Sequence, residues 1–160
     1  MANDAARSGS TDETPKVTRE LAEWTANFSN RDVTPSARTW AVHTLLDWIG
    51  VTVAGAREPL AEILTEQYAE DEGACTVIVT GKRARPHDAA MLNGSAGHAL
   101  DYDDVNASMG GHPSAPVAPV VLALGEQIGA SGEDIMRAFI VGYEVECALG
   151  SMGGVEHYNN

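Results

Sequence analysis

Apolar residues recur at helical spacing along most of the chain, and the first such segment runs from Val17 to Phe28. Leu21, Trp24 and Phe28 are separated by three or four positions, which places them on one side of a helix. We therefore expect a first helix there. Residues 1–15 are polar and acidic, and we expect them to be disordered.

A second helix is predicted to begin at Thr34-Pro35, because threonine can cap a helix and proline suits its first turn. Gly55 is expected to end it, and His43 lies off its apolar stripe and should be exposed. The predicted apolar face consists of Ala37, Trp40, Ala41, Leu45, Trp48, Ile49 and Thr52.

The same periodicity predicts further helices from Pro59 to Tyr68, over 89–100, over 115–128 and after Ser131, whose spacing to Asp134 resembles a capping box. The third of these contains two prolines and the last is rich in apolar residues. Cys75 to Thr80 is short and β-branched, which indicates a small strand or ribbon. The chain is therefore predicted to be an all-α domain with one short β-ribbon.

Small residues mark the predicted helix over 89–100. Ala90, Gly94 and Gly97 would share one face, and two glycines in one helix indicate close approach of another backbone or of a ligand. His98 and Asp101 would share the face of the last turn if the helix continues that far.

The densest group of ionisable residues follows this helix. Asp101, Asp103 and Asp104 occupy three of four positions, and like charges this close favour proton uptake by at least one carboxylate once they are partly buried. Gly110-Gly111 allows a sharp turn before His112, which Pro113 restricts to an extended conformation. An imidazole held on such a loop suits general acid or base catalysis.

Two other interpretations of these residues are open. Acidic residues at a helix end often form only a solvated turn. A transition-metal site is also conceivable, since His98, Asp101, Asp103 and His112 are suitable ligands. Their spacing matches no established metal motif, so we predict no metal and no organic cofactor.

Charge and cysteine content narrow the class of protein. The 160 residues carry a net charge of −13, with Lys16 and Lys82 as the only lysines. This acidity disfavours nucleic acid and anionic membranes and suits a salt-adapted, halophile-like source. Cys75 and Cys147 are expected to be ordinary thiols. The N-terminus lacks signal-peptide features and no apolar run could span a bilayer, so we predict a cytoplasmic protein.

One basic patch interrupts this acidic sequence. The patch consists of Arg83, Arg85 and His87, and it could hold a substrate carboxylate. The alternative without a binding function is a solvated turn, or pairing of these side chains with nearby acids. The late helix carries Glu144 and Glu146, which are expected on a polar face.

The runs NGSAGHALDYDDV (93–105) and GGHPSAPVAPVVLALGE (110–126) resemble the signature of the MmgE/PrpD family. The resemblance extends to TWAVHTLLDWIGVTVAGA (39–56) and VIVTGKRARPHDAAMLNG (77–94). This family includes 2-methylcitrate dehydratase, cis-aconitate decarboxylase and iminodisuccinate epimerase. The resemblance implies a partial helical domain over 16–160 that forms a homodimer, with the family's smaller α+β domain absent from this truncated chain.

The resemblance also implies roles for residues. An aspartate that begins the DxDD run and a histidine of the HPS run line the family's active site, and they match Asp101 and His112. Asp104, Asn106 and Ser108 are candidates for substrate binding. The sequence has Val105 where the family often has a threonine that contacts substrate.

The family's further active-site histidine and carboxylate-binding lysines are expected beyond this segment, with His157 matching a non-catalytic histidine. We therefore expect the N-terminal part of a lyase, of the 2-methylcitrate dehydratase type, that acts on a small di- or tricarboxylate and is inactive as this chain alone. Within the family, decarboxylation and epimerisation stay open. A non-catalytic helical dimerisation module, or a gene remnant, is the alternative from another class.

Overall fold

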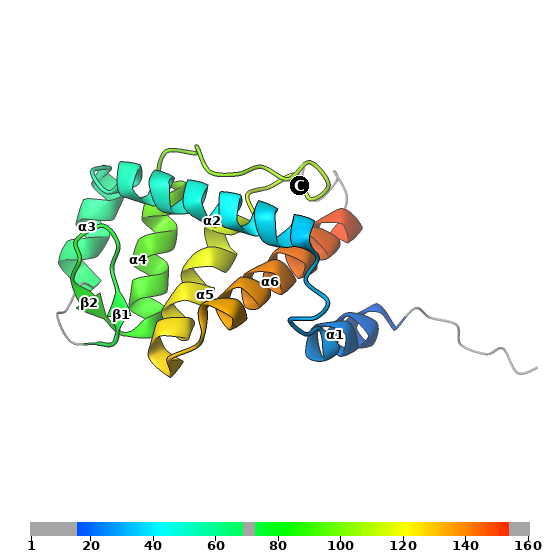
Figure 1. Ribbon diagram of the computed structural model, residues 1–160. Helices are drawn as coiled ribbons and strands as arrows, with labels where there is room; N and C mark the ends of the chain where they lie inside the picture. The colour runs from blue at the N-terminus through cyan, green and yellow to red at the C-terminus, as the bar shows by residue number, and fades with distance from the viewer. Residues whose placement is uncertain (1–15, 69–72, 154–160) are drawn as a thin grey trace, which may run out of the picture.

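The computed structural model describes residues 16–68 and 73–153, so the predicted disorder of 1–15 and the expectation for His157 lie outside the described residues. Within these ranges the fold is all-α with one short β-ribbon, as predicted (Figure 1). The elements are α1 (Val17–Asn27), α2 (Pro35–Gly55), α3 (Pro59–Tyr68), β1 (Cys75–Thr76), β2 (Arg83–Ala84), α4 (Pro86–His98), α5 (Ser114–Ile128) and α6 (Gly132–Gly153).

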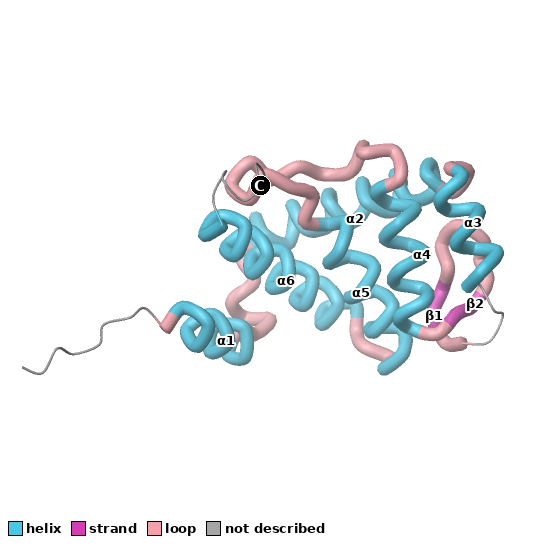
Figure 2. Tube along the Cα trace, turned by 180° about the vertical axis from the view of Figure 1, so that it is seen from behind, coloured by secondary structure: helices cyan, strands magenta, loops and turns pink. Residues whose placement is uncertain are grey.

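Helix α4 occupies the centre of the domain. It packs against α2 on one side and α5 on another, while α3 and the ribbon cover its N-terminal end. Helix α6 packs against α5 and α2, and α1 lies against α6 at the far end (Figure 2). The position of α4 determines where its C-terminal end, and therefore the aspartate-rich loop, lies.

Glycine and alanine allow the helices around α4 to approach closely. A methyl group at Gly97 would lie 2.7 Å from Nε1 of Trp48, and one at Gly55 would lie 2.0 Å from the carbonyl oxygen of Ala96. Gly94 instead faces α5, where a methyl group would lie 3.2 Å from Cγ of Pro119. The predicted close approach of another backbone is confirmed, with Gly97 against α2 and Gly94 against α5.

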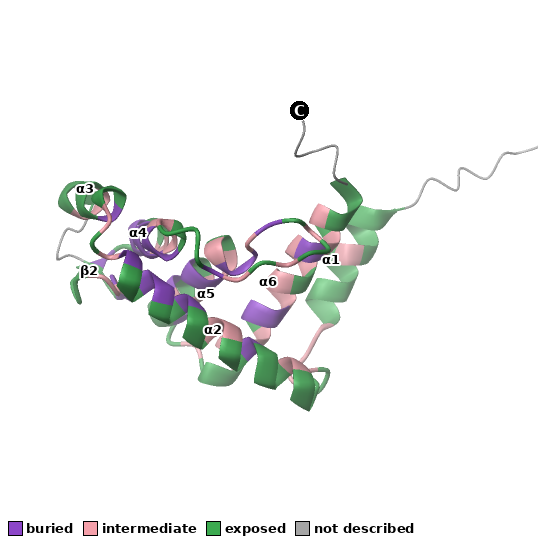
Figure 3. Ribbon diagram, turned by 90° about the horizontal axis from the view of Figure 1, so that it is seen from above, coloured by how far each residue is buried: buried purple, intermediate pink, exposed green. Residues whose placement is uncertain are grey.

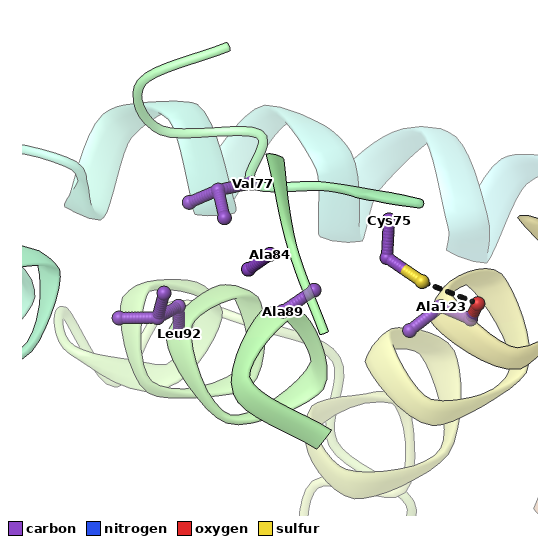
Figure 4. Packing of buried hydrophobic residues seen from close by; sticks show 6 residues of the cluster. All are labelled: Cys75, Val77, Ala84, Ala89, Leu92 and Ala123. Atoms are coloured by element: carbon purple, nitrogen blue, oxygen red, sulfur yellow. Dashed lines mark hydrogen bonds between the residues drawn. The ribbon is translucent and has the colours of Figure 1, made fainter. Parts of the chain in front are cut away.

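Two apolar clusters form the core. The first joins the ribbon to α4 and α5 (Figure 4), and its Cys75 thiol donates to the carbonyl oxygen of Ala123 at 3.1 Å. The second joins α2, α5 and α6 around Trp48 and Phe139, whose side chains are fully buried. Cys75 and Cys147 are both free thiols, as expected.

Exposed and buried segments alternate along α2 (Figure 3), and some apolar residues predicted to be buried are exposed. In α2, Trp40 and Ile49 are exposed, whereas Val51 and Gly55 are buried. In α3, the inward residue is Ala61. Ala41, Trp48 and Thr52 of the predicted face are buried, and Trp48 and Thr52 lie against Gly97 of α4. The exposed apolar residues include Trp40, Leu46, Val53, Leu60, Ile63 and Leu149.

The helix starts agree with the sequence. The Thr34 hydroxyl oxygen accepts a hydrogen bond from the Ala37 amide at 3.1 Å, and the Ser131 hydroxyl oxygen accepts one from the Asp134 amide at 3.2 Å. Gly55 does end α2, but its role is the contact with Ala96. The next residue has right-handed helical dihedrals, so this is no left-handed glycine cap.

The predicted strand over Cys75–Thr80 pairs with a second strand only at its first two residues, Cys75 with Ala84 and Thr76 with Arg83. The Arg83 guanidinium lies 3.2 Å from Glu126, and Arg85 and His87 lie 2.9 Å and 3.1 Å from Asp88. The basic patch is therefore paired with acidic side chains, which agrees with the alternative that gives it no binding function.

No helix among the described residues is both long and apolar enough to cross a membrane.

Candidate functional site

The candidate site begins where α4 ends. The helix stops at His98, short of the predicted residue 100, because the Ala99 and Asp101 amides bond to carbonyls only three residues back, those of Ala96 and His98. Asp101 then adopts a φ of 51°, the only positive φ of a non-glycine residue in the described ranges. The expectation that Asp101 continues the helical face of His98 is therefore wrong.

A closed loop brings His112 back to the end of α4. The Asn106 amide donates to the Gly111 carbonyl at 2.9 Å, and the Gly110 amide donates to the Asn106 carbonyl at 2.9 Å. Gly110 has a φ of 67°, so the predicted glycine turn is confirmed there. In Figure 1 this loop runs along the top of the domain, from α4 towards the C-terminal end of α6, before it enters α5.

Two histidines and two aspartates meet at this point. Nδ1 of His98 lies 2.9 Å from Oδ1 of Asp103, and Nδ1 of His112 lies 3.2 Å from the same oxygen. Nε2 of His112 lies 3.3 Å from Oδ1 of Asp101. The two imidazole rings contact each other edge to face, with centroids 4.9 Å apart. The structure thus brings the predicted pair, Asp101 and His112, into direct contact. A second carboxylate, Asp103, joins His112 to His98.

Exposure differs sharply among these four residues. The Asp103 side chain is 0% exposed, whereas the Asp101 side chain is 79% exposed. The His112 ring is mostly covered and the His98 ring is half exposed. A molecule that enters this site therefore meets Asp101 and the Nε2 edge of His112, while Asp103 lies beneath them.

Asp104 points the other way and fastens the loop to the helices. Its Oδ1 accepts from the Ser114 amide at 3.2 Å, at the start of α5, and its Oδ2 accepts from the Tyr143 hydroxyl at 3.0 Å. Burial, followed by the nearby Asp104 charge, raises the pKa of Tyr143 to about 12. The phenol therefore stays protonated and remains a donor.

Glu146 of α6 also lies near Asp104. Its Oε2 atom is buried and has no hydrogen-bond partner, and its pKa is raised by burial and by the charge of Asp104. The prediction that Glu146 lies on a polar face is therefore wrong, although Glu144 is exposed. Burial and the surrounding carboxylates also raise the pKa of the Cys147 thiol.

The other predicted substrate-binding residues are engaged within the loop. The Asn106 side-chain oxygen accepts from the amide and from the hydroxyl of Ser108. The Ser108 carbonyl in turn accepts from the Ser151 hydroxyl of α6 at 3.0 Å. In this arrangement Asn106 and Ser108 shape the loop and hold it on α6, and their contact with substrate stays a prediction.

A metal ion is geometrically possible here. His98, Asp101, Asp103 and His112 each offer one ligand atom, and these atoms lie within 4.8 Å of one another. Of the contacts of Asp103, the one with His98 is a hydrogen bond, whereas Nδ1 of His112 and Oδ2 of Asp103 are buried without a hydrogen-bond partner. The absence of a metal stays a prediction.

Comparison with known proteins identifies the family. The model of the MmgE/PrpD N-terminal domain matches residues 19–160. The chain belongs to the MmgE/PrpD family. Its resemblance, read from the aspartate-rich run and the HPS run, is confirmed over nearly the whole chain.

Three relatives illustrate the similarity. The cis-aconitate decarboxylase-like protein oryM of Aspergillus oryzae is 32% identical over 152 residues, which cover 88% of this chain and 32% of the relative. The cis-aconitate decarboxylase of Aspergillus terreus is 31% identical over 152 residues, which cover 90% of this chain and 31% of the relative. The cis-aconitate decarboxylase of Mus musculus is 34% identical over 112 residues, which cover 66% of this chain and 23% of the relative. The chain spans about a third or less of the length of these relatives.

Sequence reasoning missed three contributors to this corner. The sequence placed Asp103 in the acidic run and in a candidate metal set but gave it no role towards His112, and it did not link Tyr143 or Glu146 to the loop. A signal for Asp103 was present, because it is the middle member of three aspartates and lies between His98 and His112 in the sequence. No local pattern indicated Tyr143, whose partner Asp104 lies 39 residues away.

Proposed function

We propose that this chain forms the helical part of a lyase that transfers a proton beside a carboxylate group of a small di- or tricarboxylate. The observation that carries the proposal is the placement of Nε2 of His112 3.3 Å from the exposed Asp101, with the buried Asp103 on the other side of the ring. An imidazole in such a position can deliver or accept a proton and contributes about 10²–10⁴-fold to a rate.

The relatives favour one reaction over the others. The sequence pointed first to a dehydratase of the 2-methylcitrate type, whereas the relatives above carry the name cis-aconitate decarboxylase. We therefore propose decarboxylation of a cis-aconitate-like tricarboxylate. The bond to one carboxylate breaks, CO₂ leaves, and the electron pair left on the carbon skeleton takes the Nε2 proton of His112. His112 must enter this step as imidazolium, with a proton on each nitrogen, and it leaves with the proton on Nδ1.

Dehydration would use the same imidazole in the opposite sense. His112 would take the proton from the carbon beside a carboxylate and return it to the hydroxyl oxygen, and the carbon–oxygen bond would break to release water. Asp101 would orient the imidazole or bind a substrate hydroxyl in either reaction. The residues at the site are the same for both reactions, so the substrate has to be settled by experiment.

Substrate carboxylates also need cations, and the described residues supply none at this site. No lysine or arginine in 16–68 or 73–153 forms an ion pair with Asp101, Asp103 or Asp104; the arginine ion pairs are with Glu133, Glu126, Asp88 and Asp134. We propose that cationic groups come from the rest of the whole protein or from a second subunit. The inactivity of this chain alone stays our prediction.

A helical interaction module is the second candidate. The observation that favours it is the exposed apolar surface of α2, where Trp40 is 68%, Leu46 67% and Val53 56% exposed. Surface of this kind is typical of interfaces. Sedimentation of the purified chain tests this surface, since a monomer would count against the interaction module. A stable dimer is expected for both candidates, so activity has to separate them in a longer protein.

A chimera separates the two candidates. Residues 19–160 would replace the matching segment of the Aspergillus terreus cis-aconitate decarboxylase, and CO₂ release from cis-aconitate would be compared with dehydration of 2-methylcitrate. We expect a folded chimera that releases CO₂. A folded chimera that turns over neither substrate would refute the lyase proposal and favour the interaction module.

A further inference from the structure

Asp103 is the only fully buried side chain of the four-residue cluster, and its surroundings dictate where protons lie. A buried carboxylate requires hydrogen-bond donors, because an uncompensated charge in the interior is costly. The groups within reach of Oδ1 are Nδ1 of His98 at 2.9 Å and Nδ1 of His112 at 3.2 Å. No lysine or arginine among the described residues pairs with it.

We propose that Asp103 is the positioning residue of this site, and that it holds a proton on Nδ1 of both His98 and His112. A neutral imidazole carries one proton, so a proton kept on Nδ1 leaves the lone pair on Nε2. Nε2 of His112 is the atom that faces Asp101 and the accessible edge. Asp103 therefore makes Nε2 the atom that exchanges a proton with substrate.

The backbone on both sides keeps His112 from turning away. Pro113 is buried and begins the approach to α5, and Gly111 is paired with Asn106. On the opposite side, His98 holds the same carboxylate from the last turn of α4, and its ring contacts that of His112 at an interplanar angle of 66°. The buried carboxylate thus connects a rigid helix end to the loop histidine.

The contact of Asp103 with His112 is less well aligned than its contact with His98. The His98 pair satisfies hydrogen-bond geometry, whereas Nδ1 of His112 is close to the carboxylate but not in line with it. The second oxygen, Oδ2, is buried and without a partner. A small rotation of the Asp103 carboxylate would let each imidazole bond to its own oxygen, and we expect this arrangement when substrate is bound.

A bound metal would demand the opposite proton distribution. A ligating nitrogen must be free of its proton, so a metal held by Asp103 and by the two Nδ1 atoms beside it would remove the protons that our proposal places on Nδ1. The two alternatives therefore differ in a measurable quantity, the protonation of each imidazole nitrogen.

The experiment is long-range proton–nitrogen NMR of the ¹⁵N-labelled chain, which reports the protonated nitrogen of each histidine. It is run at a pH where the imidazoles are neutral, with exposed His43 as the internal control. We expect the Nδ1–H form for His98 and His112. Leucine is similar in size to aspartate but accepts no hydrogen bond. In Asp103→Leu, His112 should therefore carry its proton on the same nitrogen as His43 does.

Three results would overturn the proposal. They are an Nε2–H form of His112 in the unmodified chain, an unchanged His112 pattern in a folded Asp103→Leu variant, and a stoichiometric metal ion retained by the chain purified without chelator. If Asp103→Leu does not fold, the protonated nitrogen of His112 in the unmodified chain still tests the proposal.

The role of Asp103 in proton exchange rests on the proposed function, but the protonated nitrogen of each histidine is observed without turnover. An Nδ1–H histidine in an inert chimera would support the role of Asp103 and count only against the lyase.

Discussion

The hydroxyl of Tyr143 donates a hydrogen bond to the carboxylate of Asp104 at 3.0 Å and so ties α6 to the loop that carries His112. The two residues are 39 positions apart, and the same carboxylate accepts from the first amide of α5. The loop is thus held by two helices at the residue next to the buried Asp103, and its position depends on tertiary contacts.

Removing this bond should loosen the loop. We expect Tyr143→Phe to lower the free energy of unfolding by about 1–3 kcal/mol, because it leaves a half-buried charged acceptor without its donor. Urea unfolding measures the change, and amide hydrogen exchange over 101–113 shows whether the loop is affected first. Tyr68→Phe on exposed α3 is the control, and an equal effect of both substitutions would contradict this role.

Glu146 should make stability depend on pH. Its pKa is raised in the folded state by burial and by Asp104, so the folded protein favours the protonated form. The stabilisation is complete below the ordinary glutamate range and is lost as pH rises through the raised pKa. Glu146→Gln should therefore be more stable than the parent near neutral pH, with the difference vanishing in acid.

Thermal unfolding from pH 4 to pH 8 checks this dependence on pH. Glu66→Gln on α3 serves as the matched control, because Glu66 is exposed. A Glu146→Gln variant that is less stable than the parent at neutral pH would show that the carboxylate has a partner in the folded protein.

Two glycines should respond oppositely to alanine. At Gly97 the added methyl group would lie 2.7 Å from Nε1 of Trp48 and 2.9 Å from Oγ1 of Thr52, so we expect a loss of about 1–3 kcal/mol from overpacking. At Gly50, also helical, nothing lies within 4 Å, and alanine should gain about 0.5–1 kcal/mol. Urea unfolding of both variants tests the packing of α2 on α4.

Asp101 should tolerate asparagine better than valine. Its φ of 51° lies in the left-handed region, which asparagine and aspartate adopt far more readily than β-branched residues. We expect Asp101→Val to cost about 1–2 kcal/mol, while Asp101→Asn folds normally and lowers activity in the chimera. Full activity of the Asp101→Asn chimera would show that the Asp101 carboxylate has no role in the reaction.

The sequence predicted the helices well and the buried side of α2 in part, since Ala41, Trp48 and Thr52 are buried as expected. Start signals such as Thr34-Pro35 and Ser131 are local, and the structure confirms them. Which side of α2 is buried depends on the shape of α4, and hydrophobicity alone assigned Trp40 to the core although it is 68% exposed. Small residues determine that packing, and a search for the largest apolar stripe overlooks them.

The candidate site was predictable in its members and only partly in its geometry. The glycine turn, Asp101 and His112 followed from the sequence, because the residues lie in one short segment. The positive φ of Asp101 and the burial of Asp103 arise from the end of α4 and the return of the loop. Residues from α6 could not be assigned, since no local pattern links Tyr143 or Glu146 to Asp104.

The central claim is that His112 transfers the proton, and one comparison of rates tests it most directly. CO₂ release from cis-aconitate would be measured for the chimera with His112→Asn and with the exposed control His43→Asn. We predict that His112→Asn lowers kcat by about 10²–10⁴-fold with little change in KM, whereas His43→Asn has no effect. A folded His112→Asn chimera with the activity of the parent chimera would contradict the account.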